Sequence, residues 1–288
     1  MLAIQAAILG LVQGLAEFIP VSSSAHLVII PWLFGWTDPV LKSLGFDVSL
    51  HLGTLAALLV FFASDWWRLA KAWVASIAAR KIGEDPDRKM AWYILVACIP
   101  GGLAGVLFES RIERLFHPEG SPVGGSAMLW MAFFIALLGA LLLLADVIGA
   151  KRRALAAMGW KDALLIGLAQ AFAVFPGVSR SGATITAGLA LGLERTAAAR
   201  FSFLLSAPII AGAGAKSLYD LLKQLKTGAL ASGELALIPI GLVVAAVSGW
   251  FCIKFLLAFL QKHSTRVFVY YRWALAALLV GVAVNRGL

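Results

Sequence analysis

Long apolar runs alternate with short polar segments along most of this chain. A helix that crosses a lipid bilayer needs about 20 mostly apolar residues. Six runs meet this length, and each is bounded by polar or charged residues. The pattern predicts six transmembrane helices, at residues 45–63, 90–108, 126–145, 201–218, 235–253 and 267–285.

Two further apolar stretches are each interrupted near the middle. Residues 2–36 have one formal charge, Glu17, and residues 164–193 have one, Arg180. Irregular backbone at membrane depth is tolerated only where protein surrounds it or where it lines a watery cavity. We therefore expect two re-entrant helical hairpins, which break at Ile19-Pro20-Val21-Ser22-Ser23-Ser24 and at Phe175-Pro176-Gly177-Val178-Ser179-Arg180-Ser181.

The two broken stretches are related to each other. Residues 8–25 aligned without gaps on residues 165–182 give 8 identities in 18 positions, including Gln13/Gln170, Ser22/Ser179 and Ser24/Ser181. Three predicted spans follow each hairpin, and an odd number of spans inverts the second half. The sequence predicts an all-α polytopic membrane protein with an inverted repeat in a single membrane domain, 1–288, with repeats 1–150 and 151–288.

The composition excludes other classes of protein. Hydrophobic residues make up 61% of the chain and charged residues 14%, against about 45–50% and 25% in soluble domains. Such a chain is neither a soluble globule nor disordered. The net charge of +9 is expected in loops beside anionic lipid, so we predict a membrane partner and no nucleic acid.

Loop charge predicts the orientation, because cytoplasmic loops are rich in Lys and Arg. Loops 65–89, 147–163 and 260–272 have six, four and three such residues, whereas loops 109–125 and 223–234 have two each. We expect a protein of the bacterial inner membrane with the N-terminus, the mouth of the first hairpin and the C-terminus on the periplasmic side. The N-terminus lacks a basic leader, so no cleavable signal peptide is expected.

Glu17 is an ionisable group at membrane depth, where charges are costly and therefore indicate function. Gln13 precedes it by four residues, so both side chains lie on one helical face. Their oxygens are suited to a hard divalent cation, Mg²⁺ or Ca²⁺. The alternative is a Glu that only packs against a neighbouring helix.

Hydroxyl groups and a histidine follow the first break, at Ser22-Ser23-Ser24-Ala25-His26. Ser23 and His26 share a face if a half-helix begins here. A serine at this place caps the helix, free backbone N–H groups bind an anion, or a hydroxyl beside an imidazole acts as nucleophile with an acid–base partner. Capping without catalysis remains an alternative.

The second break combines glycines, hydroxyl groups and one arginine, which is typical of a phosphate-binding site. The guanidinium of Arg180 presents a planar fork of donors that matches phosphate oxygens, whereas an arginine that merely reaches for the interface would lie near the end of a span. We expect the substrate to be bound by Ser22, Ser24, Gly177, Ser179, Arg180, Ser181 and Thr184.

The repeat brings the two breaks together, so that a carboxylate, a Ser–His pair and an arginine converge. This set suits metal-assisted phosphoryl transfer, and a site within the membrane implies a lipid-tailed phosphate. A transporter or flippase for a lipid phosphate or small anion is the alternative, because inverted repeats are common in transporters.

Three other acidic or imidazole groups rank lower. Asp47 and His51 lie four residues apart at the start of a span and either support the site or cap the helix. Asp146 is expected to be an end-of-helix charge. Residues 66–81, with interleaved Trp and basic residues, predict an interfacial amphipathic segment.

Two segments closely resemble the two motifs of the undecaprenyl-pyrophosphate phosphatase family, also called bacitracin-resistance proteins. The likeness extends over nearly the whole chain, and three predicted spans follow each motif. The segments are Gln13-Gly14-Leu15-Ala16-Glu17-Phe18-Ile19-Pro20-Val21-Ser22-Ser23-Ser24-Ala25-His26 and Pro176-Gly177-Val178-Ser179-Arg180-Ser181-Gly182-Ala183-Thr184.

The resemblance implies removal of the terminal phosphate from a polyprenyl pyrophosphate carrier, which recycles it for cell-wall synthesis and confers bacitracin resistance, with a divalent cation as cofactor. It implies that Gln13 and Glu17 form the (Glu/Gln)-x-x-x-Glu motif, that Ser23 and His26 belong to the catalytic centre, and that Arg180 binds the pyrophosphate. In our leading hypothesis Ser23 attacks while His26 moves the proton; attack by His26 or by water is the variant. A homodimer is compatible with the chain.

Overall fold

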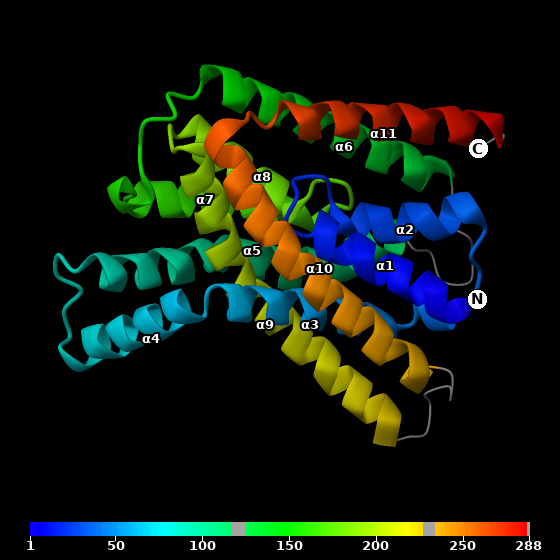
Figure 1. Cartoon of the computed structure of the whole chain (residues 1–288), viewed down its shortest axis with the longest axis horizontal. Coiled ribbons are helices and arrows are strands. Elements are labelled where there is room, and N and C mark those ends of the chain that lie inside the picture. Colours follow the sequence, from blue (N-terminus) through cyan, green and yellow to red (C-terminus); the bar gives the residue numbers. More distant parts are fainter. Residues whose placement is uncertain (117–124, 227–233, 287–288) are drawn as a thin grey trace.

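The structure, a computed structural model, describes residues 1–116, 125–226 and 234–286 (Figure 1). Within these ranges the regular structure is helical and contains no β-strand. The α-helices are α1 (Leu2–Ala16), α2 (Ser23–Phe34), α3 (Leu44–Phe61), α4 (Ala63–Ala78), α5 (Pro86–Phe116), α6 (Gly125–Ile148), α7 (Trp160–Ala171), α8 (Arg180–Ala190), α9 (Arg195–Lys226), α10 (Glu234–Lys262) and α11 (Arg266–Asn285).

Five of the six predicted spans coincide with helices that are long and apolar enough to cross a membrane. Their outward faces are apolar, as a lipid environment requires, with Val106 on α5 and Phe251 on α10 among the exposed side chains. The prediction of a polytopic all-α membrane protein is confirmed. The five segments are Pro86–Phe108, Ser126–Ile148, Arg195–Ala215, Ala236–Lys262 and Arg266–Asn285.

The first predicted span, residues 45–63, ends in a sharp turn into a second helix. Helix α3 stops at Phe61, and α4 leaves it at an angle of 80°. Helix α4 buries Leu69 and exposes Trp67, over whose ring Lys71 places its amine at 4.6 Å. This apolar and basic face agrees with the amphipathic segment expected at residues 66–81.

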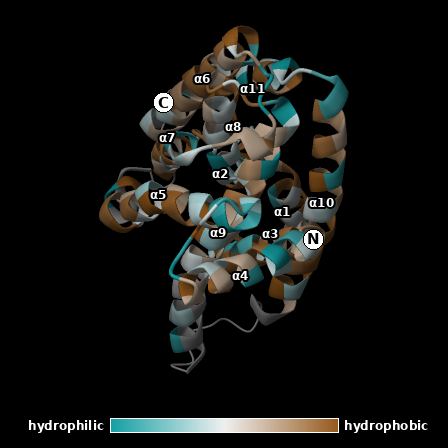
Figure 2. Ribbon diagram, turned by 90° about the vertical axis from the view of Figure 1, so that its left-hand side faces the viewer, coloured by the Kyte–Doolittle hydropathy of each residue, from teal (hydrophilic) through white to brown (hydrophobic). Residues whose placement is uncertain are grey.

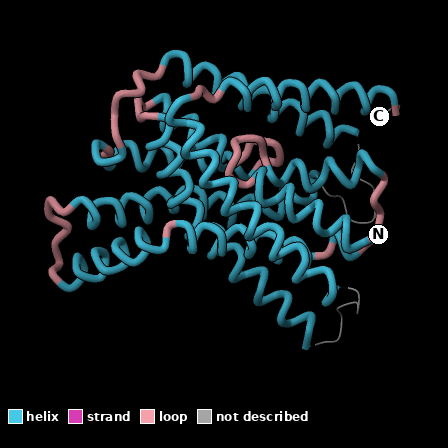
Figure 3. Tube along the Cα trace, in the orientation of Figure 1, coloured by secondary structure: helices cyan, strands magenta, loops and turns pink. Residues whose placement is uncertain are grey.

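Both broken stretches form helical hairpins. Helices α1 and α2 are separated by the break at residues 17–22, and α7 and α8 by the break at residues 172–179. Figure 3 shows the two connecting loops close together in the middle of the molecule, and Ser181 Oγ, in the first turn of α8, donates to the Ile19 carbonyl at 3.3 Å. The second hairpin therefore contacts the break of the first.

Each hairpin packs its first helix against a span that follows the other hairpin. Helix α1 packs along α10, and α7 packs along α5. The approach is close at two glycines that are equivalent in the repeat alignment: a Cβ on Gly10 would lie 2.8 Å from the Gly241 oxygen, and one on Gly167 would lie 2.5 Å from the Ala97 oxygen. Any larger residue at either position would force these helices apart.

The connections richest in Lys and Arg gather at one end of the molecule. Both termini lie at one end in Figure 1, and the α4–α5, α6–α7 and α10–α11 connections lie at the other. Figure 2, seen from this second end, shows hydrophilic residues gathered in the connections and hydrophobic residues along α6 and α10. The three loops richest in Lys and Arg thus share one end. Loops 109–125 and 223–234 lie partly outside the described residues.

Asp146, expected to be an ordinary end-of-helix charge, is buried and joins three segments. Its carboxylate accepts from Arg195 Nε on α9 at 2.6 Å and from the backbone N–H of Thr265, between α10 and α11, at 3.3 Å. The carboxylate therefore joins α6, α9 and the start of α11 at the end where the basic loops lie, and no pattern in the sequence indicates these partners.

Candidate active site

A serine in a strained conformation precedes each half-helix. Ser22 has φ of 79° and Ser179 has φ of 70°, values that non-glycine residues rarely adopt. Each caps its helix: Ser22 Oγ accepts from the Ala25 N–H at 3.4 Å, and Ser179 Oγ from the Gly182 N–H at 3.1 Å. Such strain persists where the surroundings enforce it and often marks a functional site.

Glu17 lies at the centre of the contacts between the two breaks. Its side chain is 4% exposed. Oε2 accepts from Gln13 Nε2 at 3.0 Å and from Ser23 Oγ at 2.6 Å, while Oε1 is ion-paired with Arg180. The carboxylate thus joins the first helix of one hairpin, the second helix of that hairpin, and the opposite hairpin.

Ser23 and His26 have separate partners. Ser23 Oγ bonds to Glu17, whereas His26 Nδ1 bonds to the Ser22 carbonyl at 2.6 Å and Nε2 to the Tyr271 hydroxyl at 2.7 Å. A carbonyl only accepts, so Nδ1 bears a proton and a neutral His26 accepts through Nε2. The nearest base to the Ser23 hydroxyl is therefore Glu17, and the expected pairing of Ser23 with His26 is absent from the described hydrogen bonds.

Arg180 is the first residue of α8, at the position equivalent to Ser23 in the repeat alignment. Its side chain is 18% exposed, and its buried Nε has no hydrogen-bond partner within the described part of the chain. The guanidinium thus retains donor capacity beyond its pair with Glu17. This free capacity is what a phosphate ligand would need.

The remaining predicted substrate-binding residues differ in their surroundings. Ser24 is exposed and lies 3.3 Å from Ser22, Oγ to Oγ. Thr184 is buried and bonds to Ser202 Oγ at 2.7 Å. Gly177 has φ of 99°, and a Cβ there would lie 2.9 Å from the Met131 oxygen on α6. The room that this glycine provides is used for packing against α6.

Gln13 has the side chain that best fits a cation beside Glu17. It is fully buried, and its Oε1 has no partner among the described residues. The described ranges contain no group of three or more His, Cys, Asp or Glu side chains arranged to hold a metal ion. A magnesium ion typically takes one or two carboxylates and completes its shell with substrate phosphates and water, so Gln13 and Glu17 fit a cation that arrives with a diphosphate.

Asp47 and His51 form a local pair at the start of α3. His51 Nδ1 lies 3.0 Å from the Asp47 carbonyl oxygen and 3.7 Å from its carboxylate. No hydrogen bond among the described residues joins this pair to Glu17, and the support for the site expected of it stays a prediction.

Arg272 and Tyr271 on α11 are functional candidates that sequence reasoning missed. We counted Arg272 as a loop cation, but α11 begins at Arg266 and Arg272 is 0% exposed. Its guanidinium donates to the carbonyls of Pro20, at 2.9 Å, and Gly177, at 2.8 Å. A basic residue several positions inside a predicted span was the signal that could have revealed it.

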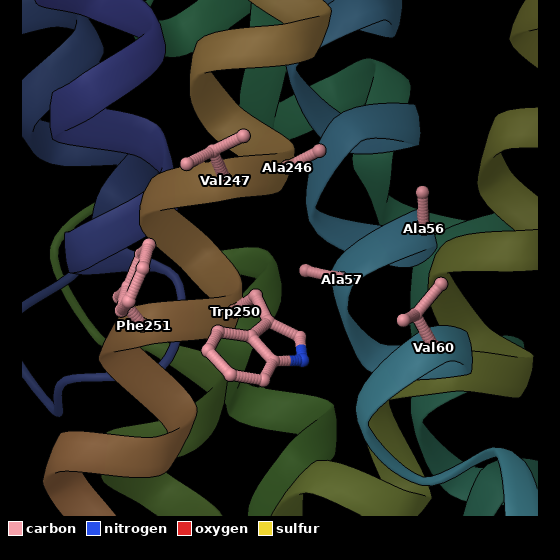
Figure 4. A pocket seen from close by; sticks show the side chains of 7 residues that line it. All are labelled: Ala56, Ala57, Val60, Ala246, Val247, Trp250 and Phe251. Carbon is pink, nitrogen blue, oxygen red and sulfur yellow. The ribbon is translucent and has the colours of Figure 1, made fainter.

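An apolar hollow lies outside this polar centre. Seven side chains of α3 and α10 line a volume of about 380 Å³, among them Val60 and Trp250 (Figure 4). No charged group takes part in the lining, so this hollow lacks the donors that a diphosphate requires. The charged and polar contacts described above lie at the breaks instead.

Comparison with known proteins identifies the chain. The family model of the bacitracin resistance protein BacA matches residues 6–278. A protein of Thermomicrobium roseum named undecaprenyl-diphosphatase is 45% identical over 276 residues, 96% of each chain. Proteins of the same name from Moorella thermoacetica and Rubrobacter xylanophilus are 46% identical over 284 residues and 44% identical over 280 residues, covering 98% and 97% of each chain. These matches confirm the resemblance seen in the two motifs, and the chain belongs to the bacitracin resistance protein BacA family.

Proposed function

We propose that this protein hydrolyses undecaprenyl diphosphate to the monophosphate and inorganic phosphate, and so recycles the lipid carrier of cell-wall synthesis. The relatives are named for this activity, as the two motifs predicted. The observation that supports a site at the breaks is the chain of contacts from Ser23 through Glu17 to Arg180, which joins a hydroxyl, a base and a guanidinium at the hairpin tips.

The contacts suggest a role for each group. Ser23 Oγ attacks the terminal phosphorus while its proton passes to Glu17 Oε2, the acceptor 2.6 Å away. The phosphorus–oxygen bond to the inner phosphate breaks, and undecaprenyl monophosphate leaves. Water then attacks the phosphorus of the phosphoserine, the bond from phosphorus to Ser23 Oγ breaks, and Glu17 returns its proton to Oγ. The proton that the attacking water loses leaves with inorganic phosphate. Arg180 exchanges its pair with Glu17 for phosphate oxygens and stabilises their charge.

The proposed roles of other residues follow from their positions. His26, held by Ser22 and Tyr271, orients the start of α2 in this scheme. Gln13 Oε1 and Glu17 would hold a divalent cation, Mg²⁺ or Ca²⁺. When bound, the cation supplies neutralisation of the diphosphate charge, which is a principal requirement of phosphoryl transfer.

We also propose that the two halves form an inverted repeat in the inner membrane, with the first hairpin open to the periplasm. The support is the exchange of partners, α1 on α10 and α7 on α5, together with the opposite ends at which α1 and α7 begin in Figure 1. The gathering of basic loops at the end away from the termini supports the sidedness.

Release of phosphate by the purified protein tests the function. In detergent, with undecaprenyl diphosphate and Mg²⁺, the wild type is expected to liberate inorganic phosphate. Chelation of divalent cations should stop the reaction, and their return should restore it. The isosteric variant Glu17→Gln, which keeps the volume and loses the base, should slow release by about 1000-fold, the scale of a lost electrostatic group.

Two outcomes would contradict the proposal. A folded wild-type protein that moves the lipid phosphate across vesicles without liberating phosphate would favour the transporter. Normal turnover by Glu17→Gln would remove Glu17 from the mechanism while leaving the activity itself intact. A monodisperse elution profile in detergent and an unchanged thermal transition serve as controls for folding.

A further inference from the structure

Arg272 is a charged side chain at the core of the molecule that the proposed reaction does not use. It lies on α11, is fully buried, and its described partners are backbone carbonyls with no carboxylate among them. Nε donates to Ile135 O at 2.8 Å, Nη1 to Pro20 O at 2.9 Å, and Nη2 to Gly177 O at 2.8 Å. One side chain thus binds α6 and both hairpin breaks.

The two carbonyls at the breaks are equivalent. In the repeat alignment Pro20 lies opposite Gly177, and each stands two residues before the strained serine that caps its half-helix. A break leaves carbonyls without helical partners, and water is scarce at membrane depth to replace them. The planar guanidinium supplies several donors in a fixed fork, so it bonds the same backbone atom of both hairpins at once.

The cost of this arrangement indicates that it serves the site. Burial of a charge without an opposite charge is expensive, and carbonyl contacts offset only part of that cost. A neutral side chain would satisfy one carbonyl more cheaply, but it would not join two breaks to α6. The feature that only a guanidinium provides here is the fixed relative position of Pro20 and Gly177.

We propose that Arg272 is a positioning residue for the phosphatase reaction. It fixes the two breaks relative to each other so that Glu17 and Ser23 from one hairpin and Arg180 from the other face the same diphosphate. The inference rests on the proposed function. Arg272 acts through the backbone at Pro20 and Gly177, and its hydrogen bonds to these carbonyls leave it no role as a phosphate ligand.

A positioning role predicts a particular kinetic signature. A shift of about 1 Å between reacting groups costs on the order of 100-fold in rate. Removal of the fork should therefore lower kcat by about 100-fold while KM changes by less than about threefold, because Arg180 still binds the phosphates. Loss of a direct phosphate ligand would instead raise KM.

The test compares three variants of the full-length protein in detergent with undecaprenyl diphosphate. Arg272→Met removes the donors at similar length, and Arg272→Lys keeps the charge but not the fork. Arg286→Ala is the matched control, since Arg286 is an exposed arginine at the C-terminal end of α11 that also donates to carbonyls, those of Trp32 and Leu33. Elution profile and thermal transition report folding.

The expected result is a low kcat in both Arg272 variants, with Arg272→Lys no more than partly restored, and a normal kcat in Arg286→Ala. If Arg272→Met does not fold, Arg272→Lys decides, and Arg272→Ala supplemented with methylguanidinium should regain rate. Normal kcat in Arg272→Lys, or a loss confined to KM, would overturn the inference. Inactive wild type would instead overturn the proposed function, so the two failures are distinguishable.

Discussion

The two hairpins share the conformation of their capping serines and differ in chemistry. Ser22 and Ser179 adopt similar positive φ values and cap the following helices in the same way. The residue after each cap differs, because the first hairpin has Ser23 where the second has Arg180. A duplicated scaffold thus places a hydroxyl and a guanidinium at equivalent positions, and both contact one carboxylate.

Glu17 distinguishes the first hairpin from the second. Gln13 and Gln170 are both buried, and each has an Oε1 without a partner among the described residues. Only Gln13 has a carboxylate one turn later; the position equivalent to Glu17 is Val174. The comparison teaches that the break can form without a carboxylate, and that the base and cation-binding roles we propose depend on one position within it.

The largest expected effect comes from replacing Ser23 and Arg180, which occupy equivalent positions in the two hairpins. Ser23→Ala should lower kcat for phosphate release by about 1000-fold or more, because it removes the attacking group. Arg180→Ala should lower kcat/KM by a similar factor with a raised KM, because it removes both a phosphate ligand and the charge that stabilises the transferred phosphate. Steady-state assays with undecaprenyl diphosphate measure both.

Matched substitutions elsewhere provide the control. Ser264→Ala removes a hydroxyl, and Arg266→Ala removes an exposed guanidinium, both at the basic end near the α10–α11 turn. Both should turn over normally. Activity of Ser23→Ala near that of the wild type would shift the attacking role to His26 or to water, which is the mechanistic variant.

A medium effect, on stability, is expected when the two capping serines are replaced. Ser22→Ala and Ser179→Ala each lose a cap and keep a positive φ that alanine disfavours, so the free energy of unfolding should fall by about 2 kcal/mol. Ser22→Gly and Ser179→Gly relieve the φ strain and should cost less than about 1 kcal/mol. Unfolding in mixed detergent measures the four variants, and unlike responses at the two serines would contradict a common design.

The smallest expected effect tests a difference between α1 and α7, the first helices of the two hairpins. Asp162 near the start of α7 accepts from Arg153 through both oxygens, at 2.9 and 2.6 Å, whereas the equivalent residue of α1 is Gln5. The hydrogen bonds from Arg153 lower the pKa of Asp162. The pair therefore adds stability at neutral pH, and this stability is lost as pH falls below about 4 toward the lowered pKa.

Asp162→Asn should reduce stability at pH 7 by less than about 1 kcal/mol, because Arg153 is partly exposed. Its unfolding transition should approach that of the wild type as the pH is lowered. A gap between the two proteins that stays constant down to pH 3 would exclude this electrostatic origin.

Much of the fold followed from hydropathy alone. The predicted span 126–145 lies within α6, and the predicted breaks, 19–24 and 175–181, overlap the observed breaks at 17–22 and 172–179. Apolar run length is a direct consequence of bilayer thickness, so it transfers reliably to structure. The 80° turn after Phe61 was not predictable, because the composition of residues 45–78 does not specify where one helix ends.

The site was predictable as a set of residues and less so as a set of contacts. The repeat implied that Glu17 and Arg180 converge, and the two are ion-paired. The spacing of Ser23 and His26 indicates that they share a helical face. It does not determine their hydrogen-bond partners, and Ser23 donates to Glu17. Arg272 escaped notice because loop charge and buried charge look alike in a sequence.

The pairing of Glu17 with Arg180 has a consequence for synthesis of the protein. The two residues are 163 positions apart, so during translation the carboxylate enters the membrane long before its guanidinium exists. An unpaired carboxylate is unstable in hydrocarbon. We therefore expect the first hairpin to remain in contact with water or the translocon until the second hairpin is inserted. The order of insertion then becomes part of how the proposed site is assembled.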